Sequence, residues 1–183
     1  AWFEKLLAER KYSDKPLDFI LTAHHANDNA ETILMNIFRG TGLTGLRGIL
    51  PARDRIRRPL LFALRAELLS FAHAEKIQWV EDSSNISGKY ARNHIRNAII
   101  PQVEKHYPAL VSSLNAAALH ARDTELFLNQ AIETCLKKLV TLKGQEQQVP
   151  IERWRQLPGT GAILYAWLKP FGFSPAQMPD IVS

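Results

Sequence analysis

A short apolar run that leads directly into a segment with helical spacing constrains the fold of this 183-residue chain more than any other feature. The run covers Asp18 to Ala23, and turn-forming or polar residues bound it on both sides. Such a run is typical of a strand that is buried on both faces of a parallel sheet. A strand that follows one helix and leads into another is characteristic of a doubly wound α/β domain. We therefore predict an α/β fold built on a parallel sheet.

The segment after this strand has one apolar face and one polar face when it is drawn as a helix. The apolar face carries Ala30, Ile33, Leu34, Ile37 and Phe38. The polar face carries Asp28, Glu31, Thr32, Met35 and Arg39. We predict that the first face packs in the core and that the second carries chemistry. The helix should end at a glycine-rich segment, residues 40–48, where a ligand can approach the backbone closely.

The candidate site is the segment from His24 to Thr32, where the strand gives way to the helix. Ligands of open α/β sheets bind beyond the carboxyl ends of the strands, so we expect Asp28 and Glu31 to face an open pocket there. Two neighbouring carboxylates can clasp an ammonium group, hold a cation or divide acid and base roles. A zinc or iron site is the rival, although adjacent histidines of an extended strand point to opposite faces. A helix cap with surface acids is the third interpretation.

Basic residues are concentrated in two stretches of a chain whose net charge is +5. The first stretch contains Arg39, Arg47, Arg53, Arg55, Arg57, Arg58 and Arg65, with only Asp54 and Glu67 as acids. The second contains Lys89, Arg92, Arg96 and Lys105, with His94 and His106 among them. Clustered arginines release counterions and grip phosphate bidentately, so the pattern favours a phosphate-rich partner. A solvated basic surface remains the alternative, as does a helix-end cation for Arg39.

The rest of the chain divides into two parts at Pro108. Before it, we predict helices over residues 64–76 and 90–106, a kink or division at Pro101, a candidate strand at 77–80 and a capping cluster at 82–85. After it, we predict a long helix to about Val140, a polar loop at 143–148 and one or two short helices within 151–173. The predicted domains are therefore 1–108, α/β, and 109–183, mainly helical.

Several classes of protein are disfavoured by composition. Cys135 is the only cysteine, so neither an intrachain disulfide nor a paired-thiolate zinc motif can form. No apolar stretch approaches the roughly 20 residues of a membrane span. The first residues have no secretory signal pattern, and both ends are abrupt, so we expect further sequence on both sides. We predict a cytoplasmic protein with no membrane partner.

Five strings of the sequence, taken together, resemble one protein family. In order they are His24 to Thr32, Arg39-Gly40-Thr41-Gly42-Leu43-Thr44-Gly45-Leu46, Arg58-Pro59-Leu60-Leu61, Glu81-Asp82-Ser83-Ser84-Asn85 and Tyr90-Ala91-Arg92-Asn93-His94-Ile95-Arg96. No single string is decisive. Their order and spacing, across roughly residues 18–108, are similar to those of tRNA(Ile)-lysidine synthases, which are N-type PP-loop ATP pyrophosphatases. The helical region that follows resembles that family's second domain more loosely.

The resemblance implies a fold and a reaction. The fold would be the remnant of an adenine nucleotide alpha hydrolase-like domain, followed by a helical domain that helps to hold tRNA. The reaction would be an ATP-dependent carbon–nitrogen ligation that modifies tRNA(Ile). ATP, with Mg²⁺, would adenylate the C2 oxygen of the wobble cytidine, and the amine of free lysine would then displace AMP. The product, lysidine, would change the specificity of the anticodon.

The resemblance also implies roles for particular residues. Catalytic roles fall on Asp28, Glu31 and Arg96. Substrate-binding roles fall on His24, His25, Thr32, Arg92 and Asn93. Nucleotide or tRNA binding falls on Arg39, Gly40, Thr41, Gly42, Arg57, Arg58 and Asn85. The two acids would recognise the ammonium or amine of lysine, with Arg92 and Arg96 near its carboxylate or the tRNA phosphates, and no metal ligands are implied.

The sequence departs from the family in one respect. The Ser-Gly-Gly-x-Asp-Ser string of the PP-loop is absent, and Gly42-Leu43-Thr44-Gly45 does not replace it. We therefore expect these 183 residues alone to use ATP poorly. Two other functions stay open, a non-catalytic RNA-binding module that uses only the basic stretches and a metal-dependent hydrolase built on His24, His25 and Asp28. A homodimer is a further option.

Overall fold

The computed structural model of this chain describes residues 5, 7, 17–80 and 91–182. Two compact units divide the chain, a first unit at Ala1–Arg122 and a second at Asp123–Ser183. Helix α7 (Leu110–Leu139) contributes residues to both. The domain boundary that we expected at residue 108 stays a prediction. Among the described residues, no helix is both long enough and apolar enough to cross a membrane.

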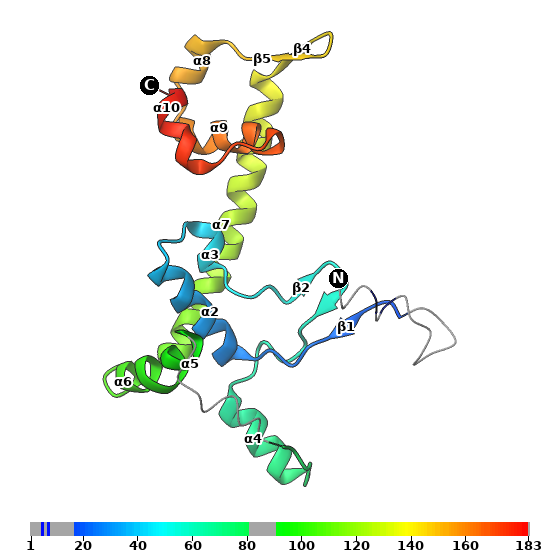
Figure 1. Ribbon diagram of the computed structural model, residues 1–183, viewed down its shortest axis with the longest axis vertical. Coiled ribbons are helices and arrows are strands. Elements are labelled where there is room, and N and C mark those ends of the chain that lie inside the picture. The colour runs from blue at the N-terminus through cyan, green and yellow to red at the C-terminus, as the bar shows by residue number, and fades with distance from the viewer. Residues whose placement is uncertain (1–4, 6, 8–16, 81–90, 183) are drawn as a thin grey trace. The chain divides into compact units, whose positions relative to one another are not determined.

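A small three-stranded sheet organises the first unit (Figure 1). Strands β1 (Ile20–Leu21) and β3 (Ile56–Arg57) are parallel, and β2 (Ala52–Arg53) is antiparallel to β3, which gives the order β1-β3-β2. Helix α2 (Ala26–Phe38) and the short helix α3 (Leu43–Leu46) lie between β1 and β2 in the chain. The parallel pair with a helical connection agrees with the predicted α/β class. Because β1 and β3 are parallel, the segments that follow them leave the sheet at the same edge.

The first strand is less buried than we predicted. Phe19 and Leu21 are 52% and 69% exposed. A strand covered on both faces would bury both side chains, so that part of the prediction is wrong. Phe19 has a different contact, because its ring lies 4.2 Å from the guanidinium carbon of Arg57.

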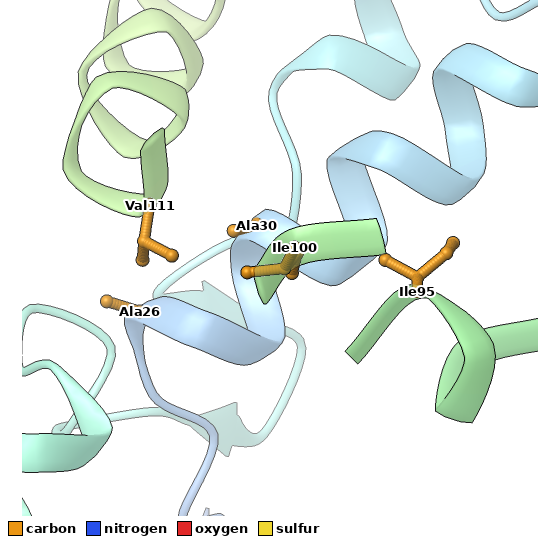
Figure 2. Packing of buried hydrophobic residues seen from close by; sticks show 5 residues of the cluster. All are labelled: Ala26, Ala30, Ile95, Ile100 and Val111. Atoms are coloured by element: carbon orange, nitrogen blue, oxygen red, sulfur yellow. The ribbon is translucent and has the colours of Figure 1, made fainter. Parts of the chain in front are cut away.

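Helix α2 packs against the helices that follow it in the first unit. Its residues Ala26 and Ala30 form a buried cluster with Ile95, Ile100 and Val111 (Figure 2). The small alanines let the other helices come close to α2, and burying the larger apolar side chains stabilises the cluster by roughly 1.5–3 kcal/mol each. The predicted burial of the apolar face is confirmed for Ala30 and Ile33. It is wrong at the end of the helix, because Ile37 and Phe38 are 44% and 60% exposed.

The predicted basic helix is interrupted where we expected it. It consists of α5 (Ala91–His94), the π-helical turn η2 (Ile95–Ile99) and α6 (Ile100–Glu104). The amide of Ile100 donates to the carbonyl of Ile95, five residues earlier, in the turn that precedes Pro101. Proline has no N–H and its ring crowds the preceding turn, which accounts for the wider helix at this point.

Helix α4 (Arg65–Ala74) confirms the predicted helix near residues 64–76. The carboxylate of Glu67 accepts a 2.7 Å hydrogen bond from the amide of Leu64 and so caps the start of the helix. The amide of Arg65 donates to the side-chain carbonyl of Asn27 in α2. Residues 77–80 do not form a strand, so that prediction is wrong.

The second unit has its own apolar core. Leu139, Trp154, Ile163, Leu164 and Met178 are buried together. They come from α7, α8 (Ile151–Arg155), α9 (Thr160–Leu168) and α10 (Met178–Val182), with the 3-10 turns η3 (Lys169–Phe171) and η4 (Pro175–Gln177) between the last two helices. The predicted short helices within 151–173 are confirmed. The predicted loop at 143–148 is instead a hairpin of β4 (Thr141–Lys143) and β5 (Glu146–Gln148), turned at Gly144 with φ +66°.

Candidate functional site

Four charged side chains meet beside the first two turns of α2. Glu31 accepts hydrogen bonds from Arg92 Nε at 2.8 Å and from Arg96 Nε at 2.6 Å. The Oδ1 atom of Asp28 accepts from the Nη2 atoms of the same two arginines, at 3.3 and 3.1 Å. We call these four residues the charge cluster. The two carboxylates and the two guanidinium groups sum to zero charge, so the cluster is internally neutral.

The members of the charge cluster differ in exposure. The side chain of Glu31 is 2% exposed and that of Asp28 is 14% exposed, whereas those of Arg92 and Arg96 are 37% and 32% exposed. Our expectation of an open pocket is therefore wrong for Glu31, which is enclosed by arginines. The hydrogen bond to Glu31 raises the pKa of Arg96 above its ordinary value, against the opposing effect of burial. Asp28 is the more accessible of the two acids.

Two histidines precede α2, and one of them caps it. His25 caps the helix: its amide donates to Asp28 Oδ2 at 3.0 Å, and the amide of Asp28 donates back to His25 Nδ1 at 3.4 Å. His24 is hydrogen-bonded to the hydroxyl of Thr22 at 2.9 Å. Burial lowers the pKa of His24 below its ordinary value; the charge of Asp28 opposes this shift, and the positive charges of Arg58 and Arg92 add to it.

Other predicted site residues have local partners or lie elsewhere. The hydroxyl of Thr32 donates to the carbonyl of Asp28, and Asn93 lies in α5 next to Arg92. Asn85 lies outside the described residues. Among the described residues, no group of three or more His, Cys, Asp or Glu side chains could hold a metal ion.

The predicted glycine-rich loop lies at the opposite end of α2 from the charge cluster. Arg39 is the C-cap of the helix and follows Asp28 by 11 positions, roughly 16 Å along the axis at 1.5 Å per residue. Gly40 has φ +72°, a conformation that suits glycine, and Thr41 and Gly42 continue to α3. The side chain of Asn36 donates to the carbonyl of Gly45 and holds the loop against the helix. The loop and the charge cluster therefore do not form one small-molecule site.

A separate open cavity of about 860 Å³ lies in the first unit. It is lined by residues of β2, of β3 and of the segment after β3, by the start of α2 and by the first half of α7, including Arg57, Arg58, Phe62, Asn115, Leu119 and Arg122. Arg57 and Arg58 are the two predicted nucleotide-binding or tRNA-binding residues that the structure brings together. Asp28 and Glu31 do not line this cavity.

Sequence reasoning missed a polar network that holds the edge of this cavity. Asn29 is 2% exposed; its Oδ1 accepts from the amide of Ile49, and its Nδ2 donates to Asn115 at 2.8 Å. Arg122 donates to the carbonyls of Arg47 and Ile49. Burial lowers the pKa of Arg122, and the nearby charge of Arg47 acts in the same direction. The partners of Asn29 and Arg122 are 20 to 86 positions away in the chain, so spacing gave no sign of them.

Two family models match the chain. A model described as a PP-loop domain matches residues 5–103, and a model described as the TilS substrate binding domain matches residues 142–183. The first match covers more than half of the sequence. The chain belongs to the PP-loop domain family, which confirms the predicted fold class.

Several proteins named tRNA(Ile)-lysidine synthase are similar to this chain. The one from Bacteroides thetaiotaomicron is 34% identical over 182 residues, which cover 100% of this chain and 41% of the relative. The one from Parabacteroides distasonis is 33% identical over 181 residues, 99% of this chain and 40% of the relative. The one from Pseudomonas aeruginosa is 41% identical over 143 residues, 76% of this chain and 31% of the relative. The resemblance drawn from the five strings is confirmed, and the chain spans about two fifths of the first two relatives.

Proposed function

We propose that this chain contributes to a tRNA(Ile)-lysidine synthase reaction, in which lysine is joined to C2 of the wobble cytidine of tRNA(Ile) at the expense of ATP. The observation that carries the proposal is the order of the two matched domains, a PP-loop domain followed by a substrate-binding domain. Relatives that align with the whole chain are named for this activity. The charge cluster supplies side chains of the chemistry that lysine recognition needs.

Lysine carries one carboxylate and two amines, so its binding site needs both an acid and a cation. In the charge cluster, Asp28 would accept an N–H of a lysine ammonium, because it is the more exposed acid. The side chain of Arg92, which is 37% exposed, would donate to the carboxylate of lysine. Buried Glu31 would hold both arginines in place and act as a positioning residue. Arg96 would help Arg92 to bind the carboxylate of lysine.

The other candidate residues support this assignment in different ways. His25 and Thr32 bond to the backbone or carboxylate of Asp28 and would fix its position, while His24 and Asn93 would line the approach to the charge cluster. Tasks on the tRNA or nucleotide fall to Arg39, Gly40, Thr41, Gly42, Arg57, Arg58 and Asn85. ATP supplies the adenylate that makes the C2 oxygen a leaving group. Mg²⁺ would be held mainly by the phosphates of ATP, since it prefers few protein ligands.

The alternative functions are not favoured. A metal-dependent hydrolase would need the imidazoles of His24 and His25, yet the first bonds to Thr22 and the second caps α2. A purely basic RNA-binding module would use the charge cluster only to stabilise the fold, whereas the relatives that align with the whole chain are named tRNA(Ile)-lysidine synthases. A homodimer and residence in the cytoplasm remain predictions, which sedimentation and cell fractionation would test.

The experiment compares Asp28→Asn with the wild type of the full-length protein in steady-state ligation assays. The amide oxygen of asparagine can still accept the His25 amide, but the negative charge is lost. Loss of one charge-assisted hydrogen bond of about 1.5–3 kcal/mol should raise KM for lysine roughly 10- to 150-fold, with KM for ATP unchanged.

The matched control is Asp18→Asn, which changes an exposed acid whose backbone carbonyl, not its carboxylate, bonds Arg55. It should behave as wild type. An Asp28→Asn enzyme with an unchanged KM for lysine would remove this residue from the lysine site.

A further inference from the structure

The cavity of the first unit holds arginines that no described carboxylate neutralises. Arg57 donates to the carbonyls of Asp54 and Ile56, and Arg58 donates to the carbonyl of Leu50. Arg122 likewise bonds two backbone carbonyls, as described above. Carbonyl groups orient a guanidinium without cancelling its charge. The arginines of the charge cluster are different, because each of them bonds two carboxylates.

One acid, Glu67, also lines the cavity, where its carboxylate caps α4 and keeps its negative charge. Three arginines, Arg57, Arg58 and Arg122, therefore face one acid among the lining residues, so the charged side chains of the lining sum to +2. The cavity is electropositive and suits an anionic ligand.

The same cavity presents flat and apolar surfaces. Phe62 is 83% exposed, although an aromatic ring of this size is usually covered in part. Leu119, from α7, is 57% exposed and lines the same cavity. The guanidinium carbon of Arg57 lies 4.2 Å from the centre of the Phe19 ring, a cation–π contact. Exposed aromatic rings next to arginines are the pattern of single-stranded nucleic acid binding, since bases stack and phosphates pair with cations.

From these contacts we infer that the cavity binds one unstacked nucleotide of an RNA strand. The base lies against Phe62 and Leu119, and a neighbouring phosphate lies near Arg57 and Arg58. The volume of about 860 Å³ is within the roughly 300–1,000 Å³ of ligand pockets and leaves room for the sugar and the adjoining strand. The inference depends on the proposed function in one respect: the proposed function identifies the RNA as tRNA(Ile).

The test measures tRNA(Ile) binding to the full-length protein without ATP or lysine, at several KCl concentrations. Phe62→Ala should raise Kd about 5- to 150-fold, because base stacking on an aromatic ring contributes about 1–3 kcal/mol. Phe62→Trp should retain tight binding. The matched control is Phe71→Ala, which removes a ring in α4 that is also exposed, at 61%, but lies outside the cavity.

The charge arm compares Arg57→Gln with Arg53→Gln. Arg57 lines the cavity, whereas Arg53 does not and pairs with Asp54 at 3.8 Å. Loss of one phosphate contact should reduce the slope of log Kd against log[KCl] by about 0.7–0.9 in Arg57→Gln and leave it unchanged in Arg53→Gln. Thermal unfolding of each variant verifies that it is folded.

Equal Kd values and slopes for the cavity variants and their controls would overturn the inference. A rise in KM for ATP without a change in tRNA Kd would also overturn it, because the cavity would then bind free nucleotide. Weaker tRNA binding in a protein that never ligates lysine would keep the inference and reject the proposed function instead.

Discussion

Replacing Glu31 by glutamine should destabilise the first unit by about 2–4 kcal/mol. The side chain of Glu31 is 2% exposed and accepts three hydrogen bonds from Arg92 and Arg96. Breaking a buried ion pair costs about 3–5 kcal/mol, because the remaining charges are left without a counterion. Water reaches the arginines, whose side chains are 37% and 32% exposed, and the amide oxygen still accepts one bond, so the lower range applies.

The assay is urea unfolding followed by circular dichroism. With a urea dependence of about 2 kcal/mol per M, the middle of the usual range, the unfolding midpoint of the first unit should fall by roughly 1–2 M. The control is Glu133→Gln, since Glu133 also forms an ion pair of 2.6 Å, with Lys137, but the side chains are 66% and 73% exposed. The Glu133 variant should not shift its midpoint measurably. Equal shifts in the two variants would refute the argument that burial makes the charge cluster structurally important.

Two further changes test the surroundings of this site. Burial lowers the pKa of His24 below its ordinary 6.5, so its neutral form stabilises the fold fully above that pH and the stabilisation is lost as the pH falls below it. The fall in urea midpoint between about pH 7 and pH 5 should therefore be shallower in His24→Gln, and an unchanged slope would contradict the role of burial. Gly48→Ala should destabilise its unit by about 1–3 kcal/mol more than Gly144→Ala does, as amide hydrogen exchange can measure. Both glycines have positive φ, 62° and 66°, but only at Gly48 would the new Cβ meet the side chain of Asn29, so equal effects would rule out this clash.

Long periodic segments were predictable from the sequence. The repeat of apolar residues located α7 and α2, because a helix of three or more turns shows its buried side several times. It also located α4, although none of the residues of that helix is buried. The short β4–β5 hairpin was missed because all of its strand residues are exposed, so they show no alternation between apolar and polar positions.

The candidate site was only partly predictable. The spacing of Asp28 and Glu31 placed them on one side of α2, as the structure has them. It could not reveal that Arg92 and Arg96 bond these acids, because the pairs are separated by 61 to 68 positions and depend on how α5 and η2 pack on α2. Buried Asn29 was missed for the same reason, since its partners Ile49 and Asn115 come from distant segments.

The most direct test of the proposed function is the incorporation of labelled lysine into tRNA(Ile) by the full-length protein. The proposal predicts incorporation that requires ATP, releases AMP and converts the wobble cytidine to a nucleoside heavier by one lysine residue, as mass spectrometry would show. No ATP-dependent incorporation, or incorporation at any other nucleotide, would contradict it.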